Sequence, residues 1–294
     1  MSILLDQSNR VLVMGATGNY GKFFMKDAGS YGTTIVAGVS PGRGGTDVDG
    51  VPVFESAKAA VVATRADTAM VFVPPVLVRA AAIEAIEAGC KLAVITADEM
   101  PVRDMIEIRA AALANGARTT GPNSPGLISP GKAKMGFMPS FCFMRGPMGV
   151  ISRSGSLSYE GCKRLTVAGI GQTTVVGIGG DPVKGMTAGE ALALFHDDPE
   201  TKAVLYLGEI GGVEEIAVAE YARSQGAKPV AALIVGKTAP PGKKMGHAAA
   251  LVGSKADGHA AKTKMLRTSG VYVSNGLPDL VKQVQVALAA ADRT

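Results

Sequence analysis

The 294-residue sequence has no tryptophan, few other aromatic residues and only three cysteines, and each scarcity narrows the class of protein. The cysteines, at positions 90, 142 and 162, are odd in number and far apart, so they form neither a disulfide framework nor a metal-like pair. A reducing compartment is therefore favoured over secretion. No run of about 18 apolar residues occurs and no charged segment leads into an apolar stretch at the N-terminus. We expect a cytoplasmic protein without a membrane span.

Charge of one sign is also not concentrated anywhere in the chain. The net charge of +5 is dispersed, with no run of four basic residues and no alternation of aromatic and basic residues. This argues against a nucleic-acid surface and suits small anionic ligands. What is abundant is glycine, with 38 residues, beside 47% hydrophobic residues. Together with the length, this predicts an α/β protein of two domains with many tight strand-to-helix turns.

The first half begins with a predicted strand–turn–helix–strand unit. Strands are expected over 10–14 and 34–39, and glycines at 15, 18 and 21 open the intervening helix. Backbone N–H groups at such a helix start can hold a pyrophosphate, although the spacing departs from G-x-G-x-x-G. An NAD site usually carries Asp or Glu after the second strand, whereas this chain has Arg43. Arg43 favours a ribose phosphate, as in coenzyme A or NADP; a solvated loop arginine is the alternative.

Further alternation of strands and helices continues to a glycine- and proline-rich segment at 121–126. Strands are predicted at 69–73 and 91–95, with helices at about 77–88 and 101–114. The segment 121–126 stops regular structure. We therefore expect domains at 1–125 and 126–294, with the boundary somewhere in 125–147.

The second half contains three segments that suit phosphate chemistry. The start of a predicted helix at Ser154, Gly155 and Ser156 offers backbone amides and hydroxyls to an anion, although Ser154 could simply cap the helix. Glu209 stands between glycines at the end of a predicted strand, and His247 lies in a Gly/Pro/Lys loop. Glu209 could set the tautomer of a nucleophilic His247. The alternatives are a solvated acid and a surface histidine; His196 and His259 are interpreted as surface residues.

Seven motifs in order resemble the family of nucleoside-diphosphate-forming acyl-CoA synthetases, which includes the succinyl-CoA synthetase α subunits. The motifs are Gly-x-Thr-Gly-x-x-Gly at 15–21, Pro-Gly-x-Gly-Gly at 41–45, Gly-Pro-Asn-x-Pro-Gly at 121–126, Ser-Arg-Ser-Gly at 152–155, Gly-Ile-Gly-Gly-Asp-Pro at 177–182, Gly-Glu-Ile-Gly-Gly at 208–212 and Met-Gly-His-Ala at 245–248. The resemblance implies a Rossmann-like CoA-binding domain followed by a flavodoxin-like parallel α/β domain.

The resemblance also implies a role for each matching residue. Coenzyme A would be held by Thr17, Gly18, Asn19, Tyr20 and Arg43, with Thr96, Ala97 and Asp98 along the path to its thiol. His247, oriented by Glu209, would receive a phosphoryl group from ATP or GTP bound with Mg²⁺ on an ATP-grasp β subunit, in an αβ or α₂β₂ assembly. The phosphohistidine would lie against Ser154, Gly155 and Ser156, and Tyr159 would contact a small carboxylic acid. No metal ligand is expected on this chain.

Departures from the family pattern leave the acid open. Ala97-Asp98-Glu99 stands where the family usually has Thr-Glu-Gly, and the segment 140–144 is more apolar than the family's. We therefore expect a succinyl-CoA synthetase-like α subunit whose acid is not necessarily succinate. The alternatives are a non-catalytic CoA-binding regulatory homologue and, less favoured, an NADP-dependent oxidoreductase.

Overall fold

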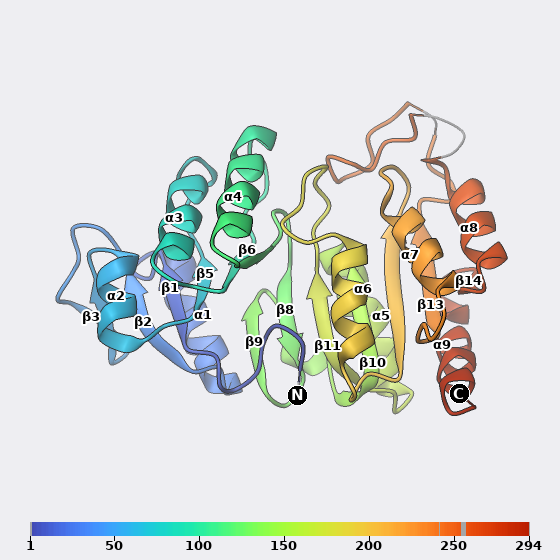
Figure 1. Ribbon diagram of the computed structural model, residues 1–294, viewed down its shortest axis with the longest axis horizontal. Helices are drawn as coiled ribbons and strands as arrows, with labels where there is room; N and C mark the ends of the chain where they lie inside the picture. Colours follow the sequence, from blue (N-terminus) through green and yellow to red (C-terminus); the bar gives the residue numbers. More distant parts are fainter. Residues whose placement is uncertain (1, 241, 254–256, 294) are drawn as a thin grey trace. The chain divides into compact units, whose positions relative to one another are not determined.

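The computed structural model describes residues 2–240, 242–253 and 257–293, which form two compact units (Figure 1). The first unit consists of Leu4–Met138 with Val183–Met186. The second is built mainly from Pro139–Pro182 and residues 187–293. Within the described residues, no helix is both long and apolar enough to cross a membrane.

The first unit contains a sheet with the strand order β3-β4-β2-β1-β5-β6-β7. Its strands are β1 (Val11–Met14), β2 (Ile35–Val39), β3 (Asp47–Val48), β4 (Val51–Phe54), β5 (Thr68–Val71), β6 (Leu92–Ile95) and β7 (Arg118–Thr120). All neighbouring strands run parallel except β3, which pairs antiparallel with β4. Without β3, this is the Rossmann strand order, in which the order of strands across the sheet reverses between β1 and β5 while the strands themselves stay parallel.

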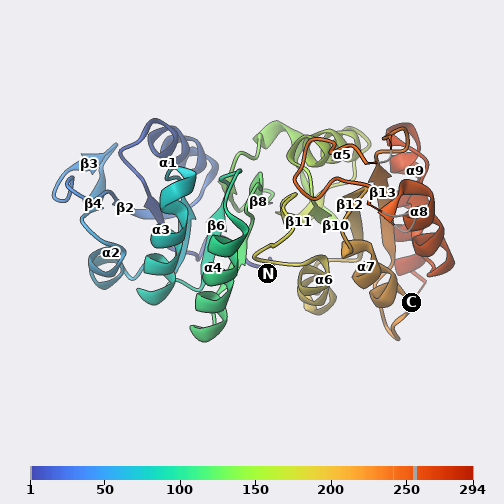
Figure 2. The same cartoon turned by 90° about the horizontal axis from the view of Figure 1, so that it is seen from above.

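Helices cover both faces of this sheet, as Figure 2 shows. They are α1 (Asn19–Tyr31), α2 (Ala57–Thr64), α3 (Pro75–Glu87) and α4 (Val102–Ala114). Every residue of β1, β5 and β6 is buried, which explains why these strands read as short continuous apolar runs rather than as alternating patterns. The unit also includes an antiparallel hairpin of β8 (Gly126–Ser129) and β9 (Ala133–Gly136).

The second unit contains parallel strands in the order β14-β13-β12-β10-β11. They are β10 (Arg145–Ser152), β11 (Gln172–Gly177), β12 (Ala203–Glu209), β13 (Val230–Val235) and β14 (Tyr272–Ser274). The helical segments are η1 (Ser140–Cys142), α5 (Gly155–Val167), α6 (Ala188–Asp197), α7 (Glu214–Arg223), α8 (His259–Thr268) and α9 (Leu277–Ala291). This is the flavodoxin-like strand order, so the predicted fold class is confirmed for both units.

Local sequence signals set where the helices begin. Thr187 and Glu190 form a reciprocal capping box at the start of α6, and Ser56 caps α2 through the amide of Ala59. Helix α1 begins at Asn19, directly after Gly18, so its start lies among the glycines at 15, 18 and 21. Helix α8 begins at His259, directly after Gly258.

The packing of α6 on the second sheet requires a residue without a side chain in β10. A Cβ added at Gly149 would lie 2.6 Å from Cδ1 of Phe195, a fully buried ring on α6. We predict that Gly149→Ala lowers the free energy of unfolding by roughly 1–3 kcal/mol through overpacking. Gly29→Ala is the matched control, because that position is exposed and its Cβ would meet nothing closer than 4.0 Å. Urea unfolding checks both, and equal destabilisation of the two variants would contradict this packing.

Candidate active site

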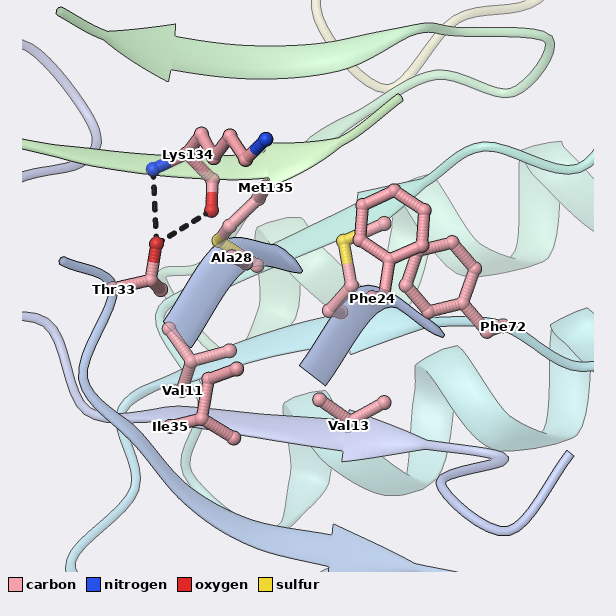
Figure 3. Close-up of a pocket in the computed structure, with 10 residues that line it drawn as sticks. Val11, Val13, Phe24, Ala28, Thr33, Ile35, Phe72, Lys134 and Met135 are labelled. Atoms are coloured by element: carbon pink, nitrogen blue, oxygen red, sulfur yellow. Dashed lines mark hydrogen bonds between the residues drawn. The ribbon is translucent and has the colours of Figure 1, made fainter. Parts of the chain in front are cut away.

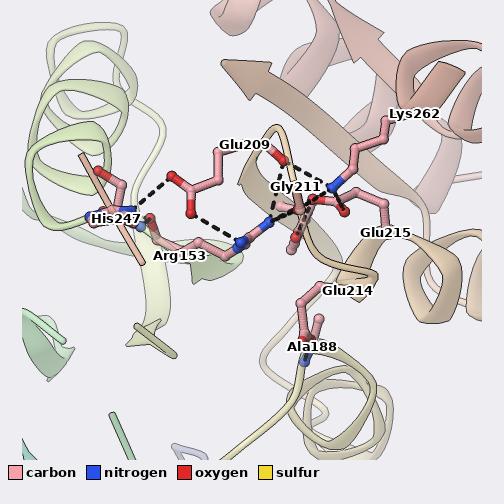
Figure 4. A network of polar contacts seen from close by, with 11 residues as sticks. Arg153, Ala188, Glu209, Gly211, Glu214, Glu215, His247 and Lys262 are labelled. Atoms are coloured by element: carbon pink, nitrogen blue, oxygen red, sulfur yellow. Dashed lines mark hydrogen bonds and ion pairs between the residues drawn. The ribbon is translucent and has the colours of Figure 1, made fainter. Parts of the chain in front are cut away.

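His247 lies in the loop that connects β13 to α8, where it is paired with a carboxylate. Its Nδ1 atom is 2.8 Å from Oε2 of Glu209, the last residue of β12 (Figure 4). The Glu209 side chain is 7% exposed and that of His247 24%, so the carboxylate is shielded while part of the ring remains accessible. The pair predicted from the sequence is therefore present, and Glu209 is not a solvated loop acid.

The ring of His247 also rests on the segment that follows β11. A Cβ added at Gly180 would lie 2.3 Å from Cγ of His247, so only glycine leaves room for the ring. The Ala249 amide donates to the Gly180 carbonyl at 3.3 Å and ties the same loop to this segment. His247 is thus held over the carboxyl ends of β11 and β12, where open α/β sheets place their ligands.

Strand β10 lies between β11 and β12, and helix α5 begins just after it. Ser154, Gly155 and Ser156 at the α5 start are consequently at the same sheet edge as His247. The Ser154 hydroxyl accepts from the Leu157 amide at 3.4 Å and lies 3.5 Å from the Ser156 hydroxyl. Ser154 therefore caps the helix, which was the alternative interpretation of this residue from the sequence. The remaining amides of the first turn still favour an anion.

Behind Glu209 lies a buried network of charged side chains (Figure 4). Nη2 of Arg153 is 3.1 Å from Oε1 of Glu209, and Nη1 is 3.6 Å from Oε1 of Glu215. Nζ of Lys262 is ion-paired with Glu215, which also accepts a 2.8 Å hydrogen bond from the Tyr206 hydroxyl. Arg153, Glu215 and Tyr206 are fully buried. Two cations thus balance two carboxylates, which is the condition for burying charge at tolerable cost.

These surroundings raise the pKa of His247 above its ordinary value. The hydrogen bond that His247 donates to Glu209 is the largest cause, and the nearby negative charges of Glu209 and Asp181 act in the same direction. Partial burial and the positive charge of Arg153 oppose the shift. The carboxylate therefore dominates the electrostatics of the ring, although it is shared with a cation.

The first unit holds a pocket of about 550 Å³ at its topological switch point. The pocket brings together Gly18, Asn19 and Tyr20 after β1 with Thr96, Ala97 and Asp98 after β6. Val73 and Pro74, which follow β5, lie between these two segments. Six of the predicted CoA-site residues thus line one pocket, as expected for a ligand site in an open α/β sheet.

The other predicted residues lie outside the lining of that pocket. The Thr17 hydroxyl is 3.0 Å from that of Ser40, and the exposed Arg43 stands in the loop after β2. Tyr159 lies one turn into α5, half-buried, and burial raises its pKa to about 12. Glu99, next to Asp98, is exposed and has a φ of 55°, a conformation that glycine adopts without strain.

A second cavity in the first unit is a packing void rather than a ligand site. It holds about 10 Å³, roughly one water molecule, and its lining includes Val11, Phe24 and Phe72 (Figure 3). The rings of Phe24 and Phe72 stack with centroids 4.2 Å apart. These aromatic residues therefore belong to the core that supports the neighbouring 550 Å³ pocket.

Sequence reasoning missed the buried network behind Glu209. Arg153 lies inside the Ser-Arg-Ser-Gly motif, but from the sequence alone an arginine beside a helix start is expected to be exposed to solvent. Lys262 lies in a polar segment and gives no sign of being 3% exposed. Of the two histidines interpreted as surface residues, His196 is exposed and His259, at the start of α8, is partly buried.

Comparison with known proteins assigns this chain to a family. A CoA binding domain matches residues 6–98, and a CoA-ligase domain matches residues 151–272. The chain is 47% identical over 275 residues to the Aquifex aeolicus succinate–CoA ligase [ADP-forming] subunit alpha, covering 93% of this chain and 90% of that one. It is 43% identical over 278 residues to the Methylorubrum extorquens malate–CoA ligase subunit alpha, covering 93% and 94%. The chain therefore belongs to the succinate–CoA ligase alpha-subunit family.

Solved structures show the same fold at lower identity. An ATP citrate lyase from Methanothrix soehngenii, in complex with citrate and coenzyme A, matches with a TM-score of 0.89 and 22% identity. The match covers 99% of this chain and 51% of that one. This structure supports the fold, while the two matched domains and the relatives at 43–47% identity confirm the predicted family. Neither matched domain supports the NADP-dependent oxidoreductase.

Replacing Glu209 with glutamine should lower the pKa of His247, because the amide has nearly the same size but no charge to favour the imidazolium. In the native protein the pKa is raised, so the pairing adds its full stability below the unfolded value near 6.5. That stability is lost as the pH rises through the folded pKa. NMR titration of the isolated chain measures the shift, with His259 as internal reference. A His247 pKa that stays equal or rises in Glu209→Gln would contradict this account.

Proposed function

We propose that this chain is the alpha subunit of a cytoplasmic, nucleoside-diphosphate-forming acid–thiol ligase, with His247 as the phosphoryl carrier. The observation that carries the proposal is the 2.8 Å contact between Nδ1 of His247 and Glu209, at the sheet edge where α5 begins. The family membership supports it, since the relatives are alpha subunits of CoA ligases. We assign coenzyme A binding to residues 1–125 and phosphoryl transfer to 126–294.

The geometry suits nucleophilic attack by Nε2. With Glu209 accepting a hydrogen bond from Nδ1–H, Nε2 keeps its lone pair and forms a bond to the γ-phosphorus of ATP or GTP. The bond from that phosphorus to the β-phosphate oxygen breaks, and the nucleoside diphosphate leaves. The amides and hydroxyls at Ser154, Gly155 and Ser156 would hold the transferred phosphoryl group.

Two further displacements complete the reaction. An oxygen of the carboxylic acid attacks the phosphorus of phosphohistidine, which restores the His247 lone pair and gives an acyl phosphate. The coenzyme A thiolate then attacks the acyl carbon, and phosphate leaves with the electron pair of the carbon–oxygen bond. Tyr159 is proposed to contact the acid. The nucleotide and its Mg²⁺ are proposed to bind on an ATP-grasp β subunit, in an αβ or α₂β₂ assembly.

The decisive experiment is phosphoryl labelling of the chain together with its β partner. Labelled ATP or GTP should mark His247, and the label should be acid-labile, as expected of a phosphoramidate. We predict that His247→Ala abolishes labelling and thioester formation, and that Glu209→Gln lowers the rate roughly 10²–10⁴-fold while the fold is kept. His196→Ala is the control and should keep the label. Acid-stable label, or label on another residue, would refute the assignment.

Coenzyme A binding by the isolated chain tests the first unit. We propose that Arg43 pairs with the ribose phosphate while Thr17, Gly18, Asn19 and Tyr20 hold the nucleotide and 96–98 line the thiol path. Arg43→Ala should weaken coenzyme A binding about 5–10-fold, a modest charge-assisted contribution, and leave dephospho-coenzyme A unaffected. Arg118→Ala is the matched control, because that exposed arginine begins β7 at the opposite sheet edge. Calorimetry showing equal losses for both ligands would remove this role for Arg43.

The acid is proposed to differ from succinate in charge or size. Glu99 adds a carboxylate beside the pocket residue Asp98, and a nearby negative charge disfavours a dianion by on the order of 1 kcal/mol. In a panel of carboxylic acids with the co-expressed pair, another acid should show a higher kcat/KM than succinate. Glu99→Gln, which removes the charge, and Glu99→Gly, which also relaxes the backbone, should shift the order towards succinate. Succinate as the best acid for the native pair would overturn this proposal.

A further inference from the structure

Arg153 is the largest fully buried side chain of the described residues, and it stands between the end of β10 and the start of α5. Its guanidinium lies directly behind the carboxylate that contacts His247 (Figure 4). Oε1 of Glu209 faces Nη2 of Arg153 at 3.1 Å, while Oε2 faces Nδ1 of His247 at 2.8 Å. The two carboxylate oxygens are therefore divided between one permanent cation and one imidazole.

The division matters because the neutral imidazole carries one proton, which lies on either Nδ1 or Nε2. When the carboxylate of Glu209 faces Nδ1, it accepts a hydrogen bond from Nδ1–H, and Nε2 keeps its lone pair. When the carboxylate turns away, a proton on Nδ1 loses this acceptor, and a proton on Nε2 blocks the lone pair. The guanidinium of Arg153 holds Oε1 at 3.1 Å and thereby keeps Oε2 directed at Nδ1.

We propose that Arg153 is a positioning residue that, through Glu209, holds His247 as the Nδ1–H tautomer with Nε2 free to take a phosphoryl group. The catalytic consequence rests on the proposed function, whereas the tautomer can be measured without it. Arg153 is suited to this task because its own position is fixed from behind. Nη1 donates to the carbonyl of Gly211 at 2.8 Å and lies 3.6 Å from Glu215.

A purely structural role is the competing explanation, since Arg153 also anchors the turn after β12. Lys262 offers a matched control for this possibility. Its Nζ donates to the carbonyls of Glu209 and Gly211, as Arg153 does, and it pairs with Glu215. The contacts found for Lys262 are with these backbone carbonyls and Glu215, not with the Glu209 carboxylate. Removing Lys262 thus weakens the same turn while the Arg153–Glu209 contact is kept.

The test is nitrogen NMR of the full chain carrying ¹⁵N-labelled histidine, recorded above the pKa of His247 so that the ring is neutral. The native protein and Lys262→Met should show a protonated Nδ1 and an unprotonated Nε2. Arg153→Met should move the proton to Nε2, and Arg153→Lys, which keeps the charge, should restore much of the native population. Circular dichroism confirms that each variant is folded; if Arg153→Met does not fold, the comparison of Arg153→Lys with Lys262→Met decides.

The outcomes separate the explanations. Retention of the native tautomer in Arg153→Met would overturn the proposal. If only Arg153→Lys folds, loss of the native tautomer in that variant would overturn it, because the positive charge is kept there. A proton that moves to Nε2 in Lys262→Met as well would show that the turn after β12, not the charge of Arg153, decides which nitrogen carries the ring proton.

Phosphorylation in the presence of the β partner supplies the functional readout. Arg153→Met should slow labelling of His247 at least 10-fold in the native background. In the Glu209→Gln background the same substitution should have little further effect, because it acts through that carboxylate. Equal losses in both backgrounds would overturn the positioning role. If native His247 is never labelled, the proposed function fails while the tautomer result still stands.

Discussion

The carboxylate of Glu209 holds the candidate site of the second unit together. One of its oxygens contacts His247, which lies in a long loop, and the other contacts Arg153, which lies between β10 and α5. Each partner comes from a different part of the chain, so the contact fixes three segments at once. Without the carboxylate of Glu209 the imidazole would lose its orienting acceptor, and the buried guanidinium would lose one of its two counter-ions.

The network behind Glu209 explains how such a charged group is kept out of water. Glu215 accepts a hydrogen bond from Tyr206 and forms ion pairs with Lys262 and Arg153. Its charge is therefore compensated by groups from three parts of the chain. Burial of Lys262 lowers its pKa, and the facing carboxylate acts in the opposite direction. The ionic cluster gives a defined geometry rather than extra stability, because desolvation consumes most of what the charges gain from one another.

The parallel sheet supplies the second constraint. Parallel strands end at the same edge, and the residues that follow them gather there whatever their separation in sequence. This places Gly180, Glu209 and the α5 start beside one another in the second unit. It also gathers the segments 18–20 and 96–98 around one pocket in the first unit. The chemistry assigned to each unit therefore uses the same geometric device.

The sequence was sufficient for the fold class, for parallel strands such as β1, β2, β5 and β6, and for the pairing of Glu209 with His247. It did not predict β3, β4, α2 or the β8–β9 hairpin. Short apolar runs such as β1 and β6 are buried on both faces, and Gly15 opens the turn that follows β1. His247 and Glu209 could be paired because one stood in an unusual loop and the other at a strand end. In the sequence, Gly180 stood out only as part of a motif. The structure explains why a glycine is needed there, because the ring of His247 rests on it and leaves no room for a side chain.

Tertiary structure alone decided the environment of that pair. Arg153 and Lys262 look solvated in sequence because a charge carries no local signal of burial, and their partners lie about 50 residues away along the chain. The same holds for the orientation of Glu209, whose two oxygens serve different neighbours. Sequence patterns report what each segment does by itself, through periodicity and turn chemistry. Which carboxylate oxygen faces the guanidinium and which faces the imidazole depends on how distant segments meet when the sheet forms.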